Sequence, residues 1–213
     1  MNKLTKAGFA GLFLSLTAVL ASCGGSSTST TDTAAVTADV YPVTVGDLTL
    51  EAQPVSIISL SPTATEMLYA IGAGSQVVAV DEYSNFPAEA VALGTTLSGF
   101  EPNIEAISGY SPDLVIISYD PGSLVEQLGT LNIPVFIAGA AMSLENVYEQ
   151  IEQLGVLTGH SQAAIEVSKT LQTGIEDAVA SVKFSEPPLS YYYELDNTYY
   201  SVTSNTFVGQ IFN

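Results

Sequence analysis

The stretch Val55–Pro87, VSIISLSPTATEMLYAIGAGSQVVAVDEYSNFP, predicts the βαβ unit around which the rest of the chain is arranged. Its first residues, up to Leu60, are rich in apolar and β-branched side chains and have the length of a strand. Ser61 and Pro62 then favour a helix start, with Ser61 as the N-cap and Pro62 in the first turn. A second apolar run, Gln76–Val80, predicts the next strand.

The helix between these two strands has one apolar face. Thr63 and Glu66 offer an alternative, capping-box start for it. Either Gly72 or Gly74 can end it, because glycine adopts the backbone conformation that closes helices. Four apolar side chains recur at helical spacing and predict the face that packs on the sheet: Ala64, Met67, Leu68 and Ile71.

Two polar loops, Ser61–Thr65 and Asp81–Pro87, follow these strands. Since α/β folds bind ligands beyond the carboxyl ends of their strands, both loops are expected to border a ligand cleft. We therefore place Ser61, Pro62 and Thr63 at the edge of that cleft. No histidine or lysine stands near Ser61 to activate it, and no nucleophile-elbow motif is present, so the sequence does not predict an enzyme.

Charge excludes some kinds of partner. The chain has 213 residues, 47% of them hydrophobic, with 22 acidic residues, four lysines, no arginine and a net charge of −18. Such a charge argues against nucleic-acid binding, which needs basic side chains to neutralise phosphates. A solvated acidic exterior that keeps a secreted protein soluble explains it more simply.

The N-terminal sequence is typical of a targeting signal. Lys3 and Lys6 precede the apolar run Phe9–Leu20, which is too short to be a good membrane span. The following Leu-Ala-Ser-Cys resembles a bacterial lipobox ending at Cys23, the only cysteine. We expect residues 1–23 to be a lipoprotein signal peptide. Lipidated Cys23 would hold the protein on the outer face of the cytoplasmic membrane or in the periplasm; an ordinary signal peptide is the alternative.

The remaining chain divides into four parts. Residues 24–53 combine a Ser/Thr-rich tether with a short hairpin, and residues 54–141 form an α/β lobe with further strands at Asp113–Ser118 and Ile133–Ala138. Residues 142–184 predict near-continuous helix, in which Gly155, Gly159 and a new cap at Ser161 allow a break. Residues 185–213 would begin a second lobe, with strands at Leu189–Leu195 and Tyr199–Thr203 and a helix from Thr206, and this lobe is expected to be cut short.

Two motifs carry a resemblance to a known family. The run S-P-T-A-T-E-M-L-Y-A-I-G-A-G followed by V-V-A-V-D-E-Y-S-N-F-P, together with P-N-I-E-A-I and S-P-D-L-V-I, resembles the iron-siderophore and vitamin B12 class of periplasmic-type binding proteins. These are receptors of ABC importers. The resemblance implies an α/β fold of two Rossmann-like lobes joined by one long helix, with the second lobe incomplete here. It also implies a monomer that delivers a small molecule to a permease and its ATPase.

Five aromatic residues are candidate ligand contacts. Tyr83, Phe100 and Tyr119 each stand in a loop beside a strand end or helix start on the first lobe. By resemblance to the vitamin B12-binding member, they fall where its corrinoid-contacting aromatics lie, and Tyr199 and Tyr200 fall near a further pocket aromatic. Aromatic faces suit a broad macrocycle. Each residue alone could equally be a half-buried surface aromatic.

Glu105 is a candidate docking residue. In the family, a glutamate in this Asn-x-Glu context docks into an arginine pocket of the permease, so the resemblance assigns that role to Glu105. Such exposed pairs set register and association rate more than affinity. The alternative is an ordinary glutamate that interacts favourably with the helix dipole.

The lack of arginine guides the choice of ligand. Anionic siderophores and haem propionates usually need arginine or lysine in the cleft, so a corrinoid of the vitamin B12 type is favoured. A neutral ferric hydroxamate siderophore or haem is the alternative, and a ligand-sensing surface lipoprotein is an alternative of another class. His160 is the only histidine, so no metal site and no cofactor is predicted.

Overall fold

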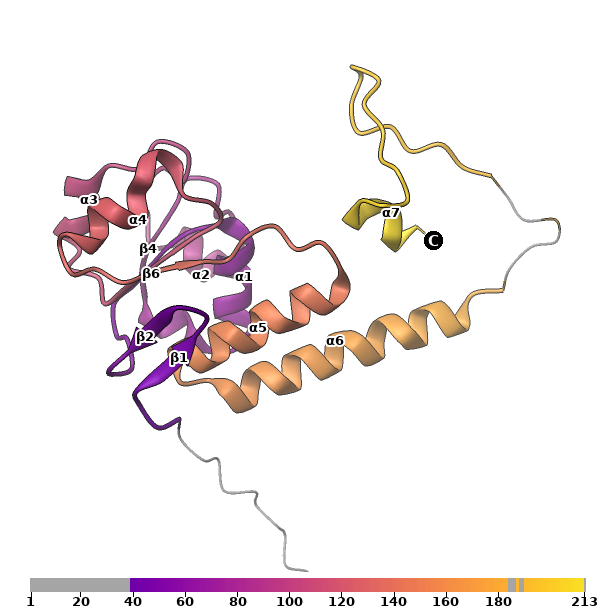
Figure 1. The fold of residues 1–213 in the computed structure, drawn as a ribbon. Helices are drawn as coiled ribbons and strands as arrows, with labels where there is room; N and C mark the ends of the chain where they lie inside the picture. Colours follow the sequence, from indigo (N-terminus) through magenta and orange to yellow (C-terminus); the bar gives the residue numbers. More distant parts are fainter. Residues whose placement is uncertain (1–38, 184–186, 188–189, 213) are drawn as a thin grey trace, which may run out of the picture. The chain divides into compact units, whose positions relative to one another are not determined.

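The computed structural model describes residues 39–183, 187 and 190–212. Its centre is a parallel four-stranded sheet in the order β4-β3-β5-β6 (Figure 1). The strands are β3 (Ile57–Leu60), β4 (Val77–Val80), β5 (Leu114–Ile117) and β6 (Val135–Ile137). The chain goes from β3 to β4 on one side and then returns past β3 to β5 on the other. The α/β fold class predicted from the sequence is confirmed.

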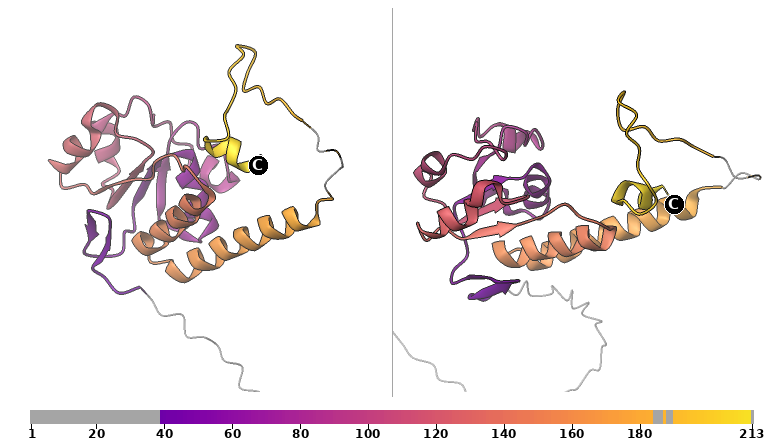
Figure 2. Two further views of the ribbon diagram at one scale, coloured as in Figure 1. Left: turned by 45° about the vertical axis from the view of Figure 1, so that its right-hand side comes forward. Right: turned by 45° about the horizontal axis from the view of Figure 1, so that its top comes forward.

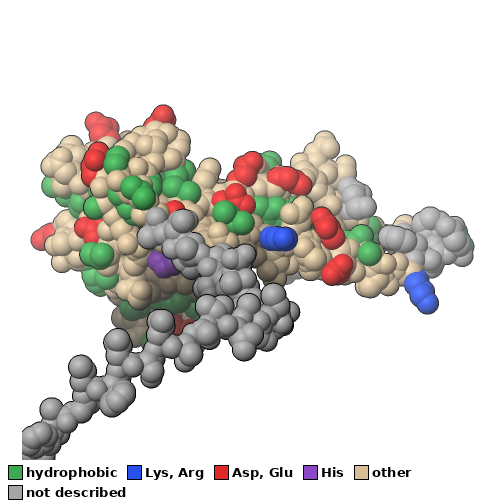
Figure 3. Space-filling view, turned by 90° about the horizontal axis from the view of Figure 1, so that it is seen from below, with side chains coloured by type: hydrophobic (Ala, Val, Ile, Leu, Met, Phe, Trp, Pro, Cys, Tyr) green, Lys and Arg blue, Asp and Glu red, His purple; other side chains and the backbone are tan. Residues whose placement is uncertain are grey.

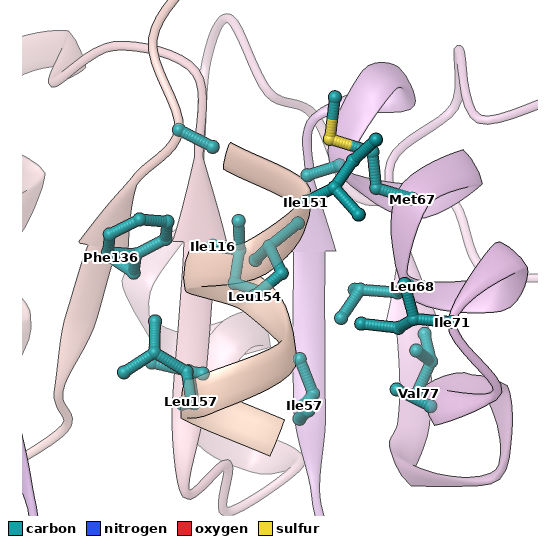
Figure 4. Close-up of a cluster of buried hydrophobic side chains, with 14 of the residues drawn as sticks. Ile57, Met67, Leu68, Ile71, Val77, Ile116, Phe136, Ile151, Leu154 and Leu157 are labelled. Atoms are coloured by element: carbon teal, nitrogen blue, oxygen red, sulfur yellow. The ribbon is translucent and has the colours of Figure 1, made fainter. Parts of the chain in front are cut away.

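Alternating strand residues serve two apolar cores on opposite faces of the sheet. Ile57 and Ile116 point to the face covered by the helices α1 and α5, whereas Ile58 and Ile117 point to the face covered by α3 and α4. Figure 4 shows the first core, in which side chains from both covering helices meet those of the strands. Both faces are covered, which explains why the strands read as continuous apolar runs.

Helix α1 (Pro62–Ala70) begins as the Ser61 reading predicts. The Ser61 hydroxyl accepts a hydrogen bond from Ala64 N at 3.3 Å, and Pro62 occupies the first turn. The capping box of Thr63 and Glu66 is therefore not the observed start. The apolar face predicted for this helix is buried. Gly72 follows the helix with φ of 86°, and the short 3₁₀ helix η1 (Ala73–Gln76) leads into β4.

Short helices connect the other strands. Between β4 and β5 lie α2 (Ala88–Val91) and α3 (Ile104–Gly109), and α3 starts at Asn103, whose side chain accepts from Ala106 N. Between β5 and β6 lie η2 (Pro121–Ser123) and α4 (Leu124–Gly129). The predicted hairpin is also present, as the antiparallel strands β1 (Val43–Val45) and β2 (Leu48–Leu50).

The break that the sequence allows at Gly159 is observed, with His160 rather than Ser161 as the new N-cap, but the single linking helix expected over residues 142–184 is wrong. Two helices, α5 (Leu144–Thr158) and α6 (Ser161–Ser181), turn back on each other at Gly159, whose φ of 76° ends α5. They pack side by side (Figures 1 and 2). Gly155 makes the close approach possible, because a Cβ at this position would collide with Ala164 Cβ. Helix α5 covers the sheet, and α6 packs on α5.

The end of α5 is tied to the amino edge of the sheet. The carbonyl oxygen of Thr158 accepts from Gln53 Nε2 at 2.8 Å and from Gln76 Nε2 at 3.1 Å. His160 Nδ1 lies 2.9 Å from the same oxygen. Gln53 precedes β3 and Gln76 precedes β4, so one carbonyl joins the turn between the two helices to the start of two strands.

Residues 190–212 form a loop followed by a short helix. The predicted strands Leu189–Leu195 and Tyr199–Thr203 are wrong within the described residues, which form a loop closed by a hydrogen bond from Leu195 N to the Tyr200 carbonyl. A strand needs a partner with a free edge, and this loop offers none among the described residues. The predicted helix start at Thr206 is confirmed by α7 (Phe207–Ile211), which the Thr206 hydroxyl caps. Across the described ranges, no helix combines the length and the apolar character needed to cross a membrane.

Candidate functional site

A hollow of about 380 Å³ lies at the carboxyl edge of the sheet. We call it the aromatic hollow. It is lined by residues at the ends of β3, β4 and β5 and by the loop before α3: Leu60, Pro62, Asp81, Tyr83, Gly99, Phe100, Ser118 and Tyr119. The strand order changes direction around β3, and open α/β sheets bind ligands at such a point.

Three of the predicted aromatic residues meet in this hollow. Tyr83 and Phe100 lie edge to face, with ring centroids 5.4 Å apart, and Phe100 lies 6.3 Å from Tyr119 at an interplanar angle of 46°. All three side chains are 44–61% exposed. They thus form a continuous apolar wall that presents both ring faces and ring edges to a ligand.

The loop carrying Phe100 is held close to β3. Glu82 N donates to the Leu97 carbonyl, and the hydroxyl of Ser98 accepts from the backbone N–H groups of Phe100 and Glu101. Gly99 makes this approach possible, because a Cβ at this position would lie 2.8 Å from the Leu60 carbonyl oxygen. The position of the Phe100 ring therefore depends on a glycine beside it.

Asp81 is the acidic residue in the hollow. Its side chain is only 4% exposed, and its Oδ1 lies 2.5 Å from the Ser84 hydroxyl. Burial raises the pKa of the Asp81 carboxyl above its ordinary value of 3.8, because desolvation disfavours the charged form. The hydrogen bonds with Ser84 act in the opposite direction without cancelling this effect.

The predicted cleft-bordering residues divide into three roles. Pro62 lines the hollow. Ser61 is buried as the cap of α1, and Thr63 is exposed and does not line it. Glu105 is exposed in the first turn of α3, outside the hollow. This leaves the Glu105 side chain accessible to a partner.

The other predicted site residues that the structure describes do not line the aromatic hollow. Tyr199 and Tyr200 belong to the loop within residues 190–212 and are 83% and 67% exposed; their placement in the cleft stays a prediction. Cys23 lies outside the described residues. His160 holds the turn between α5 and α6, and no metal-binding cluster of His, Cys, Asp or Glu occurs in the described part of the chain.

Basic side chains are scarce both on the surface and in the hollow. Figure 3 shows acidic side chains spread over one face with few basic ones. The lining of the aromatic hollow contains no lysine or arginine. A larger hollow of about 470 Å³ at the amino edge of the sheet is lined by residues 49–53, 55, 112–113, 132 and 134 and has no aromatic ring. The aromatic hollow is thus the better match to an apolar ligand.

Sequence reasoning did not single out four of the lining residues: Leu60, Asp81, Gly99 and Ser118. Asp81 directly follows the second strand of the βαβ unit, and this position was the available signal for it. Gly99 stands one residue before the predicted Phe100, but its contact with Leu60 depends on chain segments far apart in sequence. Neither burial nor close approach is visible in a local pattern.

Comparison with known proteins places the chain in a family. A family model described as periplasmic binding protein matches residues 57–213, and the chain belongs to this family. An uncharacterized ABC transporter substrate-binding lipoprotein of Bacillus subtilis (strain 168) is 28% identical over 98% of this chain and 70% of its own. A cobalamin-binding protein of Halobacterium salinarum is 31% identical over 79% of this chain and 48% of its own.

Solved structures share the fold. The periplasmic vitamin B12-binding protein BtuF of Vibrio cholerae matches 75% of this chain and 63% of its own, with a TM-score of 0.61 and 26% identity. The periplasmic haem-binding protein HutB of Vibrio cholerae matches 63% of this chain and 52% of its own, with a TM-score of 0.56 and 26% identity. The chain spans about half the length of its cobalamin-binding relative.

Proposed function

We propose that this chain is the extracytoplasmic receptor of an ABC importer and that it captures a corrinoid of the vitamin B12 type. The aromatic hollow would hold one face of the macrocycle. The permease and its ATPase would then receive the ligand, with Glu105 as one docking point. Lipidated Cys23 would keep the receptor at the membrane.

One observation carries this proposal: three aromatic side chains from three separate loops converge at the strand switch point. Tyr83, Phe100 and Tyr119 are far apart in sequence, yet they line one hollow with their rings exposed. A broad ligand gains buried apolar area against such a wall and can stack on the face of one of its rings. The absence of basic side chains from the lining favours an uncharged ligand.

Relatives support the corrinoid over other ligands without deciding the matter alone. The cobalamin-binding relative and the vitamin B12-binding structure both match most of this chain. The haem-binding structure keeps haem as the second candidate. Haem carries propionate groups, and the lining of the aromatic hollow has no lysine or arginine to form ion pairs with them.

The test is titration of the purified full-length chain with cyanocobalamin, ferrioxamine and haem by calorimetry. Because the chain has no tryptophan, quenching of tyrosine fluorescence gives a second readout. We expect cyanocobalamin to bind with a Kd of about 1 μM or tighter, which is about 8 kcal/mol, and the other two to bind at least tenfold more weakly. Tighter binding of ferrioxamine or haem would replace the corrinoid in the proposal.

A further inference from the structure

A chain of buried hydroxyl groups runs from the aromatic hollow into α1. The Asp81 carboxyl contacts the Ser84 hydroxyl, which lies 2.9 Å from the Thr65 hydroxyl. Thr65 in turn lies 2.9 Å from the Ser59 hydroxyl, and Ser59 lies 3.1 Å from the Ser61 carbonyl oxygen. All of these residues are 5% exposed or less.

The number of protons on these linked hydroxyl groups bears on the protonation state of Asp81. Four oxygen–oxygen contacts link Asp81 to the Ser61 carbonyl, but the three hydroxyl groups supply only three protons, since each has one O–H donor. With Asp81 ionised, one contact has no proton between its oxygens. A protonated Asp81 supplies the fourth: it donates to Ser84, which donates to Thr65, and so on to Ser61.

We propose that Asp81 binds a proton when an uncharged ligand covers the aromatic hollow, and that its other oxygen, Oδ2, then accepts a hydrogen bond from a ligand N–H or O–H group. The proton on Oδ1 completes the hydroxyl chain through Ser84. Oδ2 lies on the side of Gly99, 3.3 Å from where a Cβ on this lining residue would stand. The carboxyl thus reaches both the buried chain and the hollow.

The groups around Asp81 favour its neutral form. The negative charge of the neighbouring Glu82 raises the pKa of the Asp81 carboxyl further. The titratable groups that share the hollow are the phenols of Tyr83 and Tyr119, and the hydroxyls of Ser59, Thr65 and Ser84 on the facing elements are uncharged at ordinary pH. The lining contains no cation to hold a carboxylate. A macrocycle over the hollow would remove more water and raise the pKa again.

This inference rests on the proposed function and narrows its ligand class. A corrinoid carries amide groups around its ring, and an amide N–H can donate to a neutral carboxyl oxygen. A ligand carboxylate would instead meet the lone pairs of Asp81. The hollow should therefore select an amide-bearing macrocycle over a propionate-bearing one.

The proton is tested first on the ligand-free chain, so that the outcome does not depend on the proposed function. The Asp81 carboxyl carbon is followed by NMR in the chain with ¹³C-labelled aspartate, with Asp81→Asn for assignment. We expect a titration midpoint above 3.8. A midpoint at or below that value overturns the proton chain, whichever ligand binds.

Binding is tested second, with cyanocobalamin by calorimetry in buffers of different ionisation enthalpy. Wild type should take up as much as one proton, and its affinity should fall by up to about tenfold per pH unit as the pH rises through the Asp81 pKa. Asp81→Asn, whose amide can donate to Ser84 at any pH, should bind without proton uptake and more tightly than wild type at neutral pH. Ser84→Ala, which removes the proton's acceptor, should reduce uptake.

Glu82→Gln is the comparison variant, because it leaves Asp81 and every linked hydroxyl group in place; loss of its negative charge lowers the pKa of the Asp81 carboxyl, and the proton uptake should remain. Equal uptake by wild type and Asp81→Asn would overturn the role of Asp81 in binding. If wild type binds no cyanocobalamin at any pH, the ligand part fails together with the proposed function, and the NMR titration still decides the proton chain.

Discussion

The rings of Tyr83 and Phe100 lie edge to face, 5.4 Å apart and with an interplanar angle of 86°. Phe100 also contacts Tyr119, so it is the middle ring of the wall. We expect Phe100→Ala to weaken corrinoid binding by roughly 30-fold, or about 2 kcal/mol, because it removes a ring and leaves the other two without support. Calorimetric titration measures the loss.

Tyr110→Ala is the control for that experiment. Tyr110 is an exposed aromatic of the same lobe, 41% accessible, and does not line the aromatic hollow. Its removal should leave corrinoid affinity unchanged. Equal losses for Tyr110→Ala and Phe100→Ala would mean that the wall is not the binding surface.

Gly99→Ala should destabilise the protein and displace the Phe100 loop. The new Cβ would stand 2.8 Å from the Leu60 carbonyl oxygen, so the backbone must shift. We expect a loss of about 1–3 kcal/mol in the free energy of unfolding, measured by urea denaturation. Gly109→Ala, at an open helical position, should instead be neutral or stabilising by up to about 1 kcal/mol. Equal stability of the two variants contradicts the close approach at Gly99.

Gly155→Ala tests the packing of α5 on α6. Its Cβ would collide with Ala164 Cβ, and the two helices would have to separate. We expect a loss of about 2 kcal/mol or more in unfolding free energy. Gly174→Ala in α6 meets no atom and should gain up to about 1 kcal/mol from helix propensity. A stabilised Gly155→Ala would show that the helices do not pack here.

Glu105→Ala should reduce import by the complete transporter while leaving ligand affinity unchanged, because Glu105 is exposed in α3 and lies outside the aromatic hollow. Uptake of labelled ligand into cells or proteoliposomes measures the effect. Glu126→Ala is the matched control, since Glu126 lies in the first turn of α4, as Glu105 lies in the first turn of α3. A loss of affinity in Glu105→Ala would point to a role in the pocket instead.

Ionisation of Tyr41 should lower the stability of the protein at alkaline pH. Burial, reinforced by Asp39, raises the pKa of the Tyr41 phenol from 10.0 to about 12, and its O–H donates to the Leu157 carbonyl at 3.1 Å. The folded state thus keeps a proton that the unfolded state releases. Its stabilising contribution is complete below pH 10.0 and is lost as the pH rises to about 12. In urea denaturation over this range, Tyr41→Phe should show a smaller decline than wild type; parallel declines would contradict the assignment.

Helix caps and the apolar face of α1 were predicted well because each depends on residues that are close in sequence. The Ser61 cap, the spacing of apolar residues in α1 and the Asn103 cap each depend on a few neighbouring residues, and each is observed. Tyr83 and Tyr119 closely follow parallel strands, whose carboxyl ends meet at one edge of the sheet, whereas Phe100 lies in the loop before α3 and was placed by the family resemblance.

Tertiary relationships account for the errors. The apolar pattern continues across Gly159, so the sequence did not show that α6 turns back on α5. The tyrosine-rich run near Tyr191 has strand-like composition, but a strand also needs a neighbouring edge. Burial of Asp81 depends on the approach of the Gly99 loop, which no local pattern reveals.

The three contacts to the Thr158 carbonyl oxygen have a mechanical consequence. They fasten the turn between α5 and α6 to the starts of β3 and β4, at the edge of the sheet opposite the aromatic hollow. The end of α6 that is fixed to the sheet thus lies at its amino edge, away from the aromatic hollow. We expect the site formed by Tyr83, Phe100 and Tyr119 to keep the same shape with and without the ligand.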